Sequence, residues 1–299
     1  MNNTNKQHLI VLDLDGTLLE GFDKYDEETF SYLRKLNEDG HIIVIATGRP
    51  YRSSNFVYEA LKLHSPIINY NGARVTNPTD NTYPITDIRI DRKDLLDIVE
   101  HVKDYLVGVF CEVIDDIYVQ NYTDGIHPFL HVDGGILHKG DLKDILPDNP
   151  NGALFFLKEE KVKEFENYIN NDYIGKLYTR YWGMNGYHIV EVYSPEVDKQ
   201  MSFVKIMEYY NIPKERCIAI GDGHNDIGLI ETAGIGVAMG NAHPELKKVA
   251  KFHTDDYKKI INDNIDNLRS NRTVKQIVRP TGDKNSLERS NNKFLWSVF

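Results

Sequence analysis

The chain has 299 residues, which is a length typical of two domains. Its hydrophobic fraction of 41% and charged fraction of 27% are those of an ordinary soluble globular protein. The formal net charge of -10 argues against nucleic acids or anionic membranes as partners. An anionic substrate would therefore need a locally positive pocket.

The N-terminus and the cysteines indicate a reducing compartment. Met1 to Gln7 is polar, and the apolar run that follows is too short for a signal peptide or a membrane span. Cys111 and Cys217 are far apart in the sequence and have apolar surroundings, which predicts buried, reduced thiols. We therefore expect a cytoplasmic protein.

The first predicted element is a short buried strand that ends in two carboxylates. The apolar run Leu9–Leu12 leads into Asp13 and Asp15, and Gly16 and Thr17 follow. A run of this length that ends at a turn signal is typical of a core strand in a parallel sheet. Ligands of such sheets bind beyond the carboxyl ends of the strands, so we expect both acids to face a functional site.

Helices and strands alternate in the next segment. Asp26 begins a helical pattern, and residues 41–46 form a second apolar run that delivers Thr47 and Gly48. Pro50 stands where the first position of a helix would be, so Thr47 and Gly48 would lie at a helix N-terminus, a natural anion site. The alternation predicts an α/β fold with a doubly wound parallel sheet.

The pattern changes after a predicted hairpin-like ribbon at residues 67–85. Asp91 can cap a helix whose apolar positions extend to Leu106, and strand-like runs follow at 107–111, 117–119 and 153–157. A helix at about 161–170 and strands near 177–182 and 187–193 complete the segment. Helices mixed with closely spaced strands predict an α+β module inserted into the α/β core.

The core pattern resumes near residue 194. Lys199 begins a helix, and the apolar run 217–220 presents Gly221 and Asp222. A further helix ends at Gly234, and residues 235–239 form a last core strand. Residues 271–299 are basic and end in an aromatic segment, which predicts a poorly ordered tail or, alternatively, a docking segment for a partner.

Four pieces of this chain, in this order, resemble the signatures of the haloacid dehalogenase-like (HAD) superfamily. They are Asp13–Leu18, Ala46–Arg49, Lys199 and Gly221–Asp226. The resemblance is closest to Cof-type phosphatases, which carry a large C2-type cap between the second and third signatures. It implies a Rossmann-like core at 1–82 and 194–270 and a substrate-specificity cap at 83–193. The tail at 271–299 matches no feature of this family.

The carboxylates suit a phosphate ester as substrate. Asp13 is the candidate nucleophile, because an aspartate can form an aspartyl-phosphate intermediate. Mg²⁺ prefers a few carboxylates together with water and phosphate oxygens, which Asp13 and Asp222 can supply. The resemblance implies that the backbone carbonyl of Asp15 is a third ligand, which leaves the Asp15 side chain as general acid and base.

Further residues are expected to hold the phosphate group. Thr47 and Lys199 complete the catalytic set, and Asp226 would support Lys199 or hydrogen-bond to waters on the metal. The residues expected to bind substrate phosphate are Leu14, Thr47, Gly48, Lys199 and Asn225.

For some of these residues the sequence leaves alternatives open. Gln200 stands where the family usually has a glycine after the lysine, and Lys205 and Lys214 are alternatives to Lys199. Arg49 could contact substrate or brace its loop. In the cap, a predicted turn at Tyr181–Tyr187 contains Trp182 and Asn185, which are candidate specificity residues.

The leading functional prediction is a Mg²⁺-dependent phosphomonoesterase that acts on sugar phosphates or phosphorylated cofactors. A phosphomutase on the same fold and a non-catalytic binding protein are the alternatives. The expected partner is a small-molecule phosphate ester, without nucleic acid or membrane, and the expected assembly is a monomer or homodimer.

Overall fold

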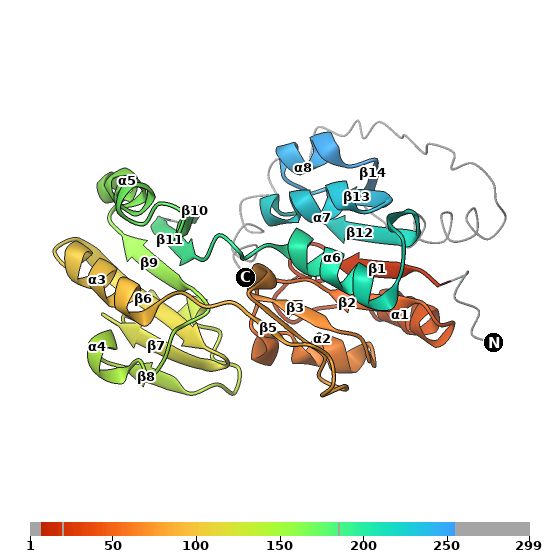
Figure 1. Ribbon diagram of the computed structural model, residues 1–299, viewed down its shortest axis with the longest axis horizontal. Coiled ribbons are helices and arrows are strands. Elements are labelled where there is room, and N and C mark those ends of the chain that lie inside the picture. The colour runs from red at the N-terminus through yellow and green to blue at the C-terminus, as the bar shows by residue number, and fades with distance from the viewer. Residues whose placement is uncertain (1–6, 20, 185, 255–299) are drawn as a thin grey trace.

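A computed structural model describes residues 7–254 of the chain, except Glu20 and Asn185. The predicted tail at 271–299 and the predicted core segment at 255–270 lie outside these residues. Figure 1 shows two parts side by side, a core built from both ends of the chain and a cap built from its middle. The predicted α/β core with an inserted α+β cap is confirmed.

The core contains a parallel sheet of five strands in the order β14-β13-β12-β1-β2. Every residue of β1, β2, β12 and β13 is buried, as expected for apolar strands covered on both faces. The strands are β1 (Leu9–Leu12), β2 (Ile42–Ile45), β12 (Cys217–Gly221), β13 (Ile235–Met239) and β14 (Phe252–Thr254).

Short helices flank this sheet, and their ends carry the expected caps. The Asp26 carboxylate accepts a hydrogen bond from the backbone N–H of Thr29 at 2.7 Å, and Asp198 caps α6 in the same way. The core helices are α1 (Glu27–Glu38), α2 (Asn55–Ala60), α6 (Lys199–Tyr210), α7 (Ile227–Thr232) and α8 (Pro244–Val249).

The prediction that a helix starts at Pro50 is wrong. Pro50 precedes a 3₁₀ turn at Tyr51–Ser53, and the α-helix begins only at Asn55. Thr47 and Gly48 therefore lie on a loop and not at a helix N-terminus. Proline fits the start of either kind of helix, so the sequence could not distinguish them.

A small antiparallel sheet continues the core toward the cap. It consists of β3 (Ile67–Asn69), β4 (Arg74–Thr76) and β5 (Thr86–Asp87), so the predicted ribbon is confirmed and gains a third strand. β5 pairs with β4 and not with the cap sheet. The boundary between core and cap at residue 83 stays a prediction.

The cap is a sheet of six strands in the order β10-β11-β9-β6-β7-β8, with helices α3 and α5 on the side away from the core (Figure 1). Its strands are β6 (Leu106–Val113), β7 (Asp116–Gln120), β8 (Leu137–Lys139), β9 (Ala153–Leu157), β10 (Tyr178–Met184) and β11 (Tyr187–Tyr193). Its helices are α3 (Arg92–Val102), α4 (Leu142–Ile145) and α5 (Val162–Asp172).

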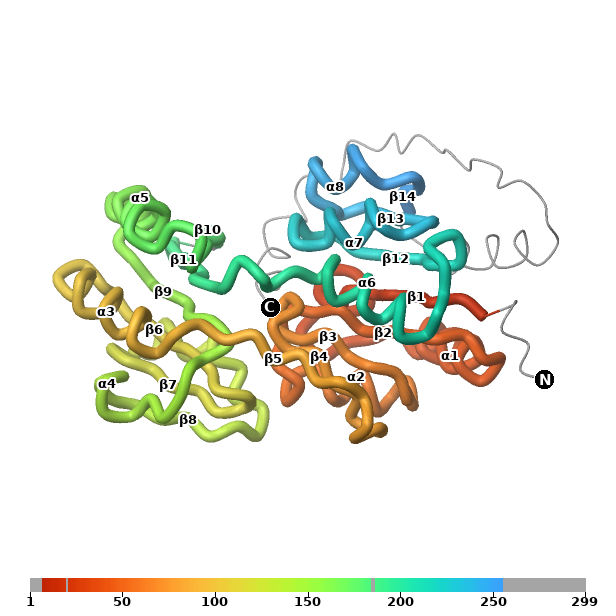
Figure 2. Tube along the Cα trace, viewed as in Figure 1, coloured from red at the N-terminus to blue at the C-terminus, as the bar shows by residue number. Residues whose placement is uncertain are grey.

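Alternating strand residues give the cap sheet two apolar faces. Phe155 belongs to the cluster that includes α3 and α5, whereas its neighbour Phe156 belongs to a cluster on the other face. Leu106, predicted as helical, begins β6 instead. Figure 2 follows the chain as it leaves the core after β5 and returns between β11 and α6.

Two further sequence predictions concern thiols and membranes. Cys111 and Cys217 are free and buried, as predicted, and burial raises the pKa of the Cys217 thiol to about 12. Within residues 7–254, the structure has no helix with the length and apolar character that crossing a membrane requires.

Candidate active site

Three carboxylates meet at the carboxyl edge of the core sheet. β1 and β12 are adjacent and parallel, with Leu12 beside Ile220, so Asp13 and Asp222 emerge next to each other. Asp226 approaches from the turn that follows β12. One oxygen from each of the three carboxylates lies within 4.8 Å of the others. The structure thus brings together two acids that are 209 residues apart in the sequence.

Lys199 lies beneath these carboxylates at the first position of α6. Its side chain is fully buried, and its Nζ donates to Asp13 Oδ1 at 2.7 Å and to Asp226 Oδ1 at 2.8 Å. Burial alone would lower the pKa of Lys199, but the two carboxylates outweigh it and raise the pKa. The rival lysines, Lys205 and Lys214, are both exposed, so the geometry favours Lys199.

The charge in this cluster fits a divalent cation. Burial raises the pKa of Asp13 and raises that of Asp222 to about 7, since few counter-charges offset the lost hydration. When ionised, the three carboxylates outnumber the Lys199 ammonium by two negative charges. Carboxylate oxygens are the ligands that Mg²⁺ prefers. The donor set and the excess charge therefore both suit Mg²⁺.

Asp226 shapes the loop that presents Asp222. Its Oδ2 accepts the backbone N–H groups of Asp222 at 3.2 Å and Gly223 at 3.0 Å, while Oδ1 accepts from Lys199. A Cβ atom at Gly221 would lie 2.6 Å from the Asp226 carboxyl carbon, so only glycine allows this approach. These contacts occupy both oxygens of Asp226 and suit the supporting role predicted for it.

Asp15 is paired with Arg49, which answers one question that the sequence left open. Arg49 Nε donates to Asp15 Oδ2 at 2.8 Å, a second nitrogen donates to Oδ1, and both side chains are buried. The guanidinium also lies under the Phe22 ring, 4.1 Å from its centroid. Burial raises the pKa of Asp15, and Arg49 opposes this rise. Here Arg49 braces Asp15.

The predicted phosphate-binding residues border the same edge of the sheet. Thr47 is fully buried, and its Oγ1 accepts the Arg49 N–H at 3.1 Å. Asn225 is half-buried and donates to Asn71 Oδ1 at 2.8 Å. The Leu14 side chain is buried in the core, so only its backbone could contact a phosphate.

Asn241 is a site residue that the sequence reasoning missed. Its Nδ2 donates to Asp222 Oδ2 at 2.8 Å and to the Gly16 carbonyl at 3.1 Å, which joins the loops after β1, β12 and β13. Thr17 Oγ1 donates to the other oxygen of Asp222 at 3.3 Å. The available signal was position, because Asn241 follows the end of a predicted parallel strand.

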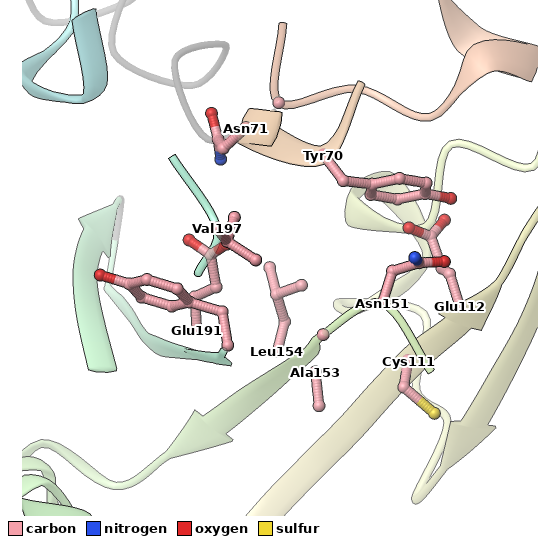
Figure 3. A pocket seen from close by; sticks show the side chains of 12 residues that line it. Tyr70, Asn71, Cys111, Glu112, Asn151, Ala153, Leu154, Glu191 and Val197 are labelled. Atoms are coloured by element: carbon pink, nitrogen blue, oxygen red, sulfur yellow. The ribbon is translucent and has the colours of Figure 1, made fainter. Parts of the chain in front are cut away.

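A cavity lies between the cap and the core, next to Gly48 (Figure 3). It encloses about 490 Å³ of space that no atom fills, open solvent at its mouth included. Tyr181 and Trp182 lie in β10 and do not line it, and Asn185 is outside the described residues. The lining residues are Gly48, Tyr70, Asn71, Cys111, Glu112, Asn151, Gly152, Ala153, Leu154, Glu191, Tyr193 and Val197.

Comparison with known proteins identifies the family. A profile described as haloacid dehalogenase-like hydrolase matches residues 10–262. The chain belongs to this family. As a HAD-like hydrolase of the Cof type, it is a phosphatase, in agreement with the sequence prediction.

The relatives of this HAD-like hydrolase match it over most of their length. The chain is 36% identical over 252 residues to the 5-amino-6-(5-phospho-D-ribitylamino)uracil phosphatase YitU of Bacillus subtilis, covering 83% of this chain and 92% of that protein. It is 27% identical to YcsE of the same organism, which has the same described activity, with 83% and 89% covered. A haloacid dehalogenase-like hydrolase from Bacteroides thetaiotaomicron has a TM-score of 0.73 at 26% identity, over 86% of this chain and 99% of that chain.

Proposed function

We propose that this phosphatase is a Mg²⁺-dependent phosphomonoesterase that hydrolyses small phosphorylated metabolites through an aspartyl-phosphate on Asp13. The observation that carries the proposal is the buried cluster of Asp13, Asp222 and Asp226 around Lys199. It combines a nucleophilic carboxylate, a fixed positive charge and an excess negative charge that suits a metal ion.

The residues present can carry both steps of the reaction. An oxygen of Asp13 attacks phosphorus in line, and the bond from phosphorus to the leaving oxygen breaks while Asp15 donates its proton to that oxygen. Asp15 then takes a proton from water, whose oxygen attacks phosphorus and releases Asp13 and inorganic phosphate. Lys199, paired with Asp13, would orient the nucleophile and offset phosphoryl charge.

The metal would be held by Asp13, Asp222 and the Asp15 backbone carbonyl. When bound, Mg²⁺ would neutralise the charge between the phosphate and the carboxylates. Asp15 must be protonated before it can act as an acid, so it must exchange its contact with Arg49 for the leaving oxygen. Its burial, which raises the pKa of its carboxyl group, favours the protonated form.

The proposed substrate is a phosphorylated polyol or amino sugar alcohol. Two relatives are described as acting on 5-amino-6-(5-phospho-D-ribitylamino)uracil, and this ester is the first candidate for the chain. The cavity beside Gly48 offers carboxylate, amide and phenol groups to such a leaving group. A cytoplasmic location, and a monomer or homodimer as the assembly, stay predictions from the sequence.

Phosphate release is the direct test. The purified protein is assayed on 5-amino-6-(5-phospho-D-ribitylamino)uracil and on p-nitrophenyl phosphate, with Mg²⁺ or with EDTA. Asp13→Asn removes the nucleophile, and Asp104→Asn, an exposed cap position, is the matched control. We expect metal-dependent release that Asp13→Asn abolishes and Asp104→Asn retains. Release that persists in Asp13→Asn would refute the proposed mechanism. Conversion of a hexose 1-phosphate to an isomer would instead indicate a mutase.

A further inference from the structure

The cavity between cap and core adjoins the groups expected to hold phosphate. Gly48 lines it and directly follows Thr47. Asn71 also lines it and accepts a hydrogen bond from Asn225. A phosphate held by Thr47, Gly48 and Asn225 would therefore lie next to this cavity. The cavity is thus where the rest of the substrate would lie.

The charged side chains that line the cavity are both acidic. They are Glu112 from β6 and Glu191 from β11, and Figure 3 shows them on opposite sides of the cavity. Each is paired with an arginine, Arg52 and Arg180 respectively, but neither arginine lines the cavity. No lysine, arginine or histidine lines it among the described residues. A ligand there meets two carboxylates, together with amide and phenol groups, and no cation among the lining residues.

The side chain of Glu191 is held by hydrogen bonds to one of its two carboxylate oxygens. Arg180 and the indole N–H of Trp182 both donate to Oε2, each at 3.1 Å. The side chain is therefore fixed in orientation by two donors on one oxygen. The other oxygen, Oε1, is available to accept a hydrogen bond from a ligand. Trp182 thus contributes to the cavity indirectly, by orienting Glu191.

Asn151 presents a second acceptor, and its orientation is fixed. Its Nδ2 donates to Asp87 Oδ1 at 2.8 Å and to the Ile88 carbonyl at 3.0 Å. Both partners are acceptors, so a flipped amide would place oxygen against oxygen. Oδ1 is buried, since the residue is only 3% exposed. It has no hydrogen-bond partner among the described residues. An unpaired buried acceptor is unfavourable, and a ligand donor that reaches Oδ1 would satisfy it.

We propose that this cavity selects an uncharged leaving group rich in hydrogen-bond donors and rejects one that carries a second anionic group, with Glu191 and Asn151 as specificity-determining residues. Hydroxyl, amino and ring N–H groups can donate to these oxygens. A carboxylate or second phosphate brings only acceptors and a like charge, which is unfavourable in a partly desolvated site. This inference rests on the proposed function, because it concerns the leaving group of the same reaction.

The test compares two esters that differ in one group. D-Sorbitol 6-phosphate and 6-phosphogluconate are both open-chain six-carbon esters with matching hydroxyls, but the second has a carboxylate where the first has a hydroxymethyl group. We expect kcat/KM to favour the sorbitol ester by about tenfold or more, which corresponds to ~1.4 kcal/mol. Equal values for the two esters would overturn the inference, and the proposed function would stand.

Variants assign the preference to its source. Glu191→Gln keeps the shape and removes the charge, so the ratio of the two kcat/KM values should fall several-fold. Glu160→Gln, at an exposed cap position, should leave the ratio unchanged. An unchanged ratio in Glu191→Gln would remove Glu191 from the proposal. Asn151→Ser, which shortens the acceptor, should lower kcat/KM for the sorbitol ester more than for p-nitrophenyl phosphate.

Binding separates this inference from the proposed function. Calorimetric titration of Asp13→Asn with each ester measures selection without turnover. Preferential binding of the sorbitol ester supports the cavity assignment even if the wild-type protein releases no phosphate, a result that would refute only the proposed function. Equal binding of both esters by Asp13→Asn would refute the cavity assignment.

Discussion

Lys199→Met should both destabilise the protein and inactivate it. Methionine has a similar length but no charge, so the variant loses two ion pairs, at 2.7 Å to Asp13 and 2.8 Å to Asp226, from a fully buried position. Removing one partner of a buried pair costs about 3–5 kcal/mol, because the remaining charge is left uncompensated. For domains of this size, ~1 kcal/mol shifts the melting temperature by about 2–4 °C. The expected loss is therefore about 6–20 °C.

The assay is thermal unfolding in EDTA, with Lys205→Met as a control at an exposed position of the same helix. Lowering the pH should reduce the deficit of Lys199→Met, because burial raises the pKa of Asp13 and protonation removes its uncompensated charge. Phosphatase activity should fall by at least about a hundredfold, since Lys199 orients the nucleophile. A melting temperature within the range of Lys205→Met, with activity retained, would refute this account of the charge cluster.

Three further predictions concern the metal, the pH and Arg49. Asp222→Asn removes one of the mutually repelling carboxylates, so it should raise the melting temperature in EDTA. Mg²⁺ should stabilise the wild type against heat and should not stabilise this variant. Because the pKa of Asp222 is about 7 in the folded protein, the metal-free fold binds more protons than the unfolded chain between about pH 4 and 7. Its free energy of unfolding should fall as the pH rises through that interval, by up to about 1.4 kcal/mol per pH unit, and Mg²⁺ affinity measured by titration should rise over the same interval. Arg49→Lys cannot reproduce the two-point contact with Asp15, so it should slow alkyl phosphates more than p-nitrophenyl phosphate, whose leaving group needs no proton.

Local sequence signals predicted the framework well. The run Leu9–Leu12 and the run at 217–220 are continuous apolar segments, and a buried parallel strand needs no more than that. Asp26 and Asp91 each cap a helix, because the carboxylate accepts a backbone N–H from the first turn of that helix. Such signals are contained within a few residues, so the sequence displays them directly.

The errors occurred where distant contacts decide the structure. Leu106 continues the apolar rhythm of α3, but it pairs with Leu157 of β9 and so begins a strand. The strand predicted near 177–182 is confirmed, but it continues to Met184, so most of the turn predicted at 181–187 is paired strand. In each case, pairing with another strand overrides the local pattern, and the sequence does not show which strand is adjacent.

Some residues of the site could be predicted from local signals, and others could not. Asp13 and Asp222 were predictable as a pair, because the ends of parallel strands share one edge of the sheet. Asn241 was not, because its contact with Gly16 spans 225 residues and depends on the course of the loop after β13. Glu191 and Asn151, which line the cavity, belong to the cap. No short stretch of sequence indicates how the cap lies over the core, so these two residues could not be predicted.

A series of contacts leads from the interface of cap and core to Arg49, the partner of Asp15. Arg52 of the core is buried, pairs with Glu112 of the cap and donates to the His131 carbonyl at 3.1 Å. The His131 ring in turn stacks on Phe22, with centroids 4.5 Å apart, and Phe22 covers the guanidinium of Arg49.

The cavity is lined from both parts, so it exists only when the cap lies against the core as it does here. We expect a leaving group that fits the cavity to stabilise the same arrangement, in which His131 stacks on Phe22 and Phe22 covers Arg49, the partner of Asp15. It follows that a poorly fitting ester should lose kcat as well as affinity, because it weakens the packing around the residue that supplies its proton.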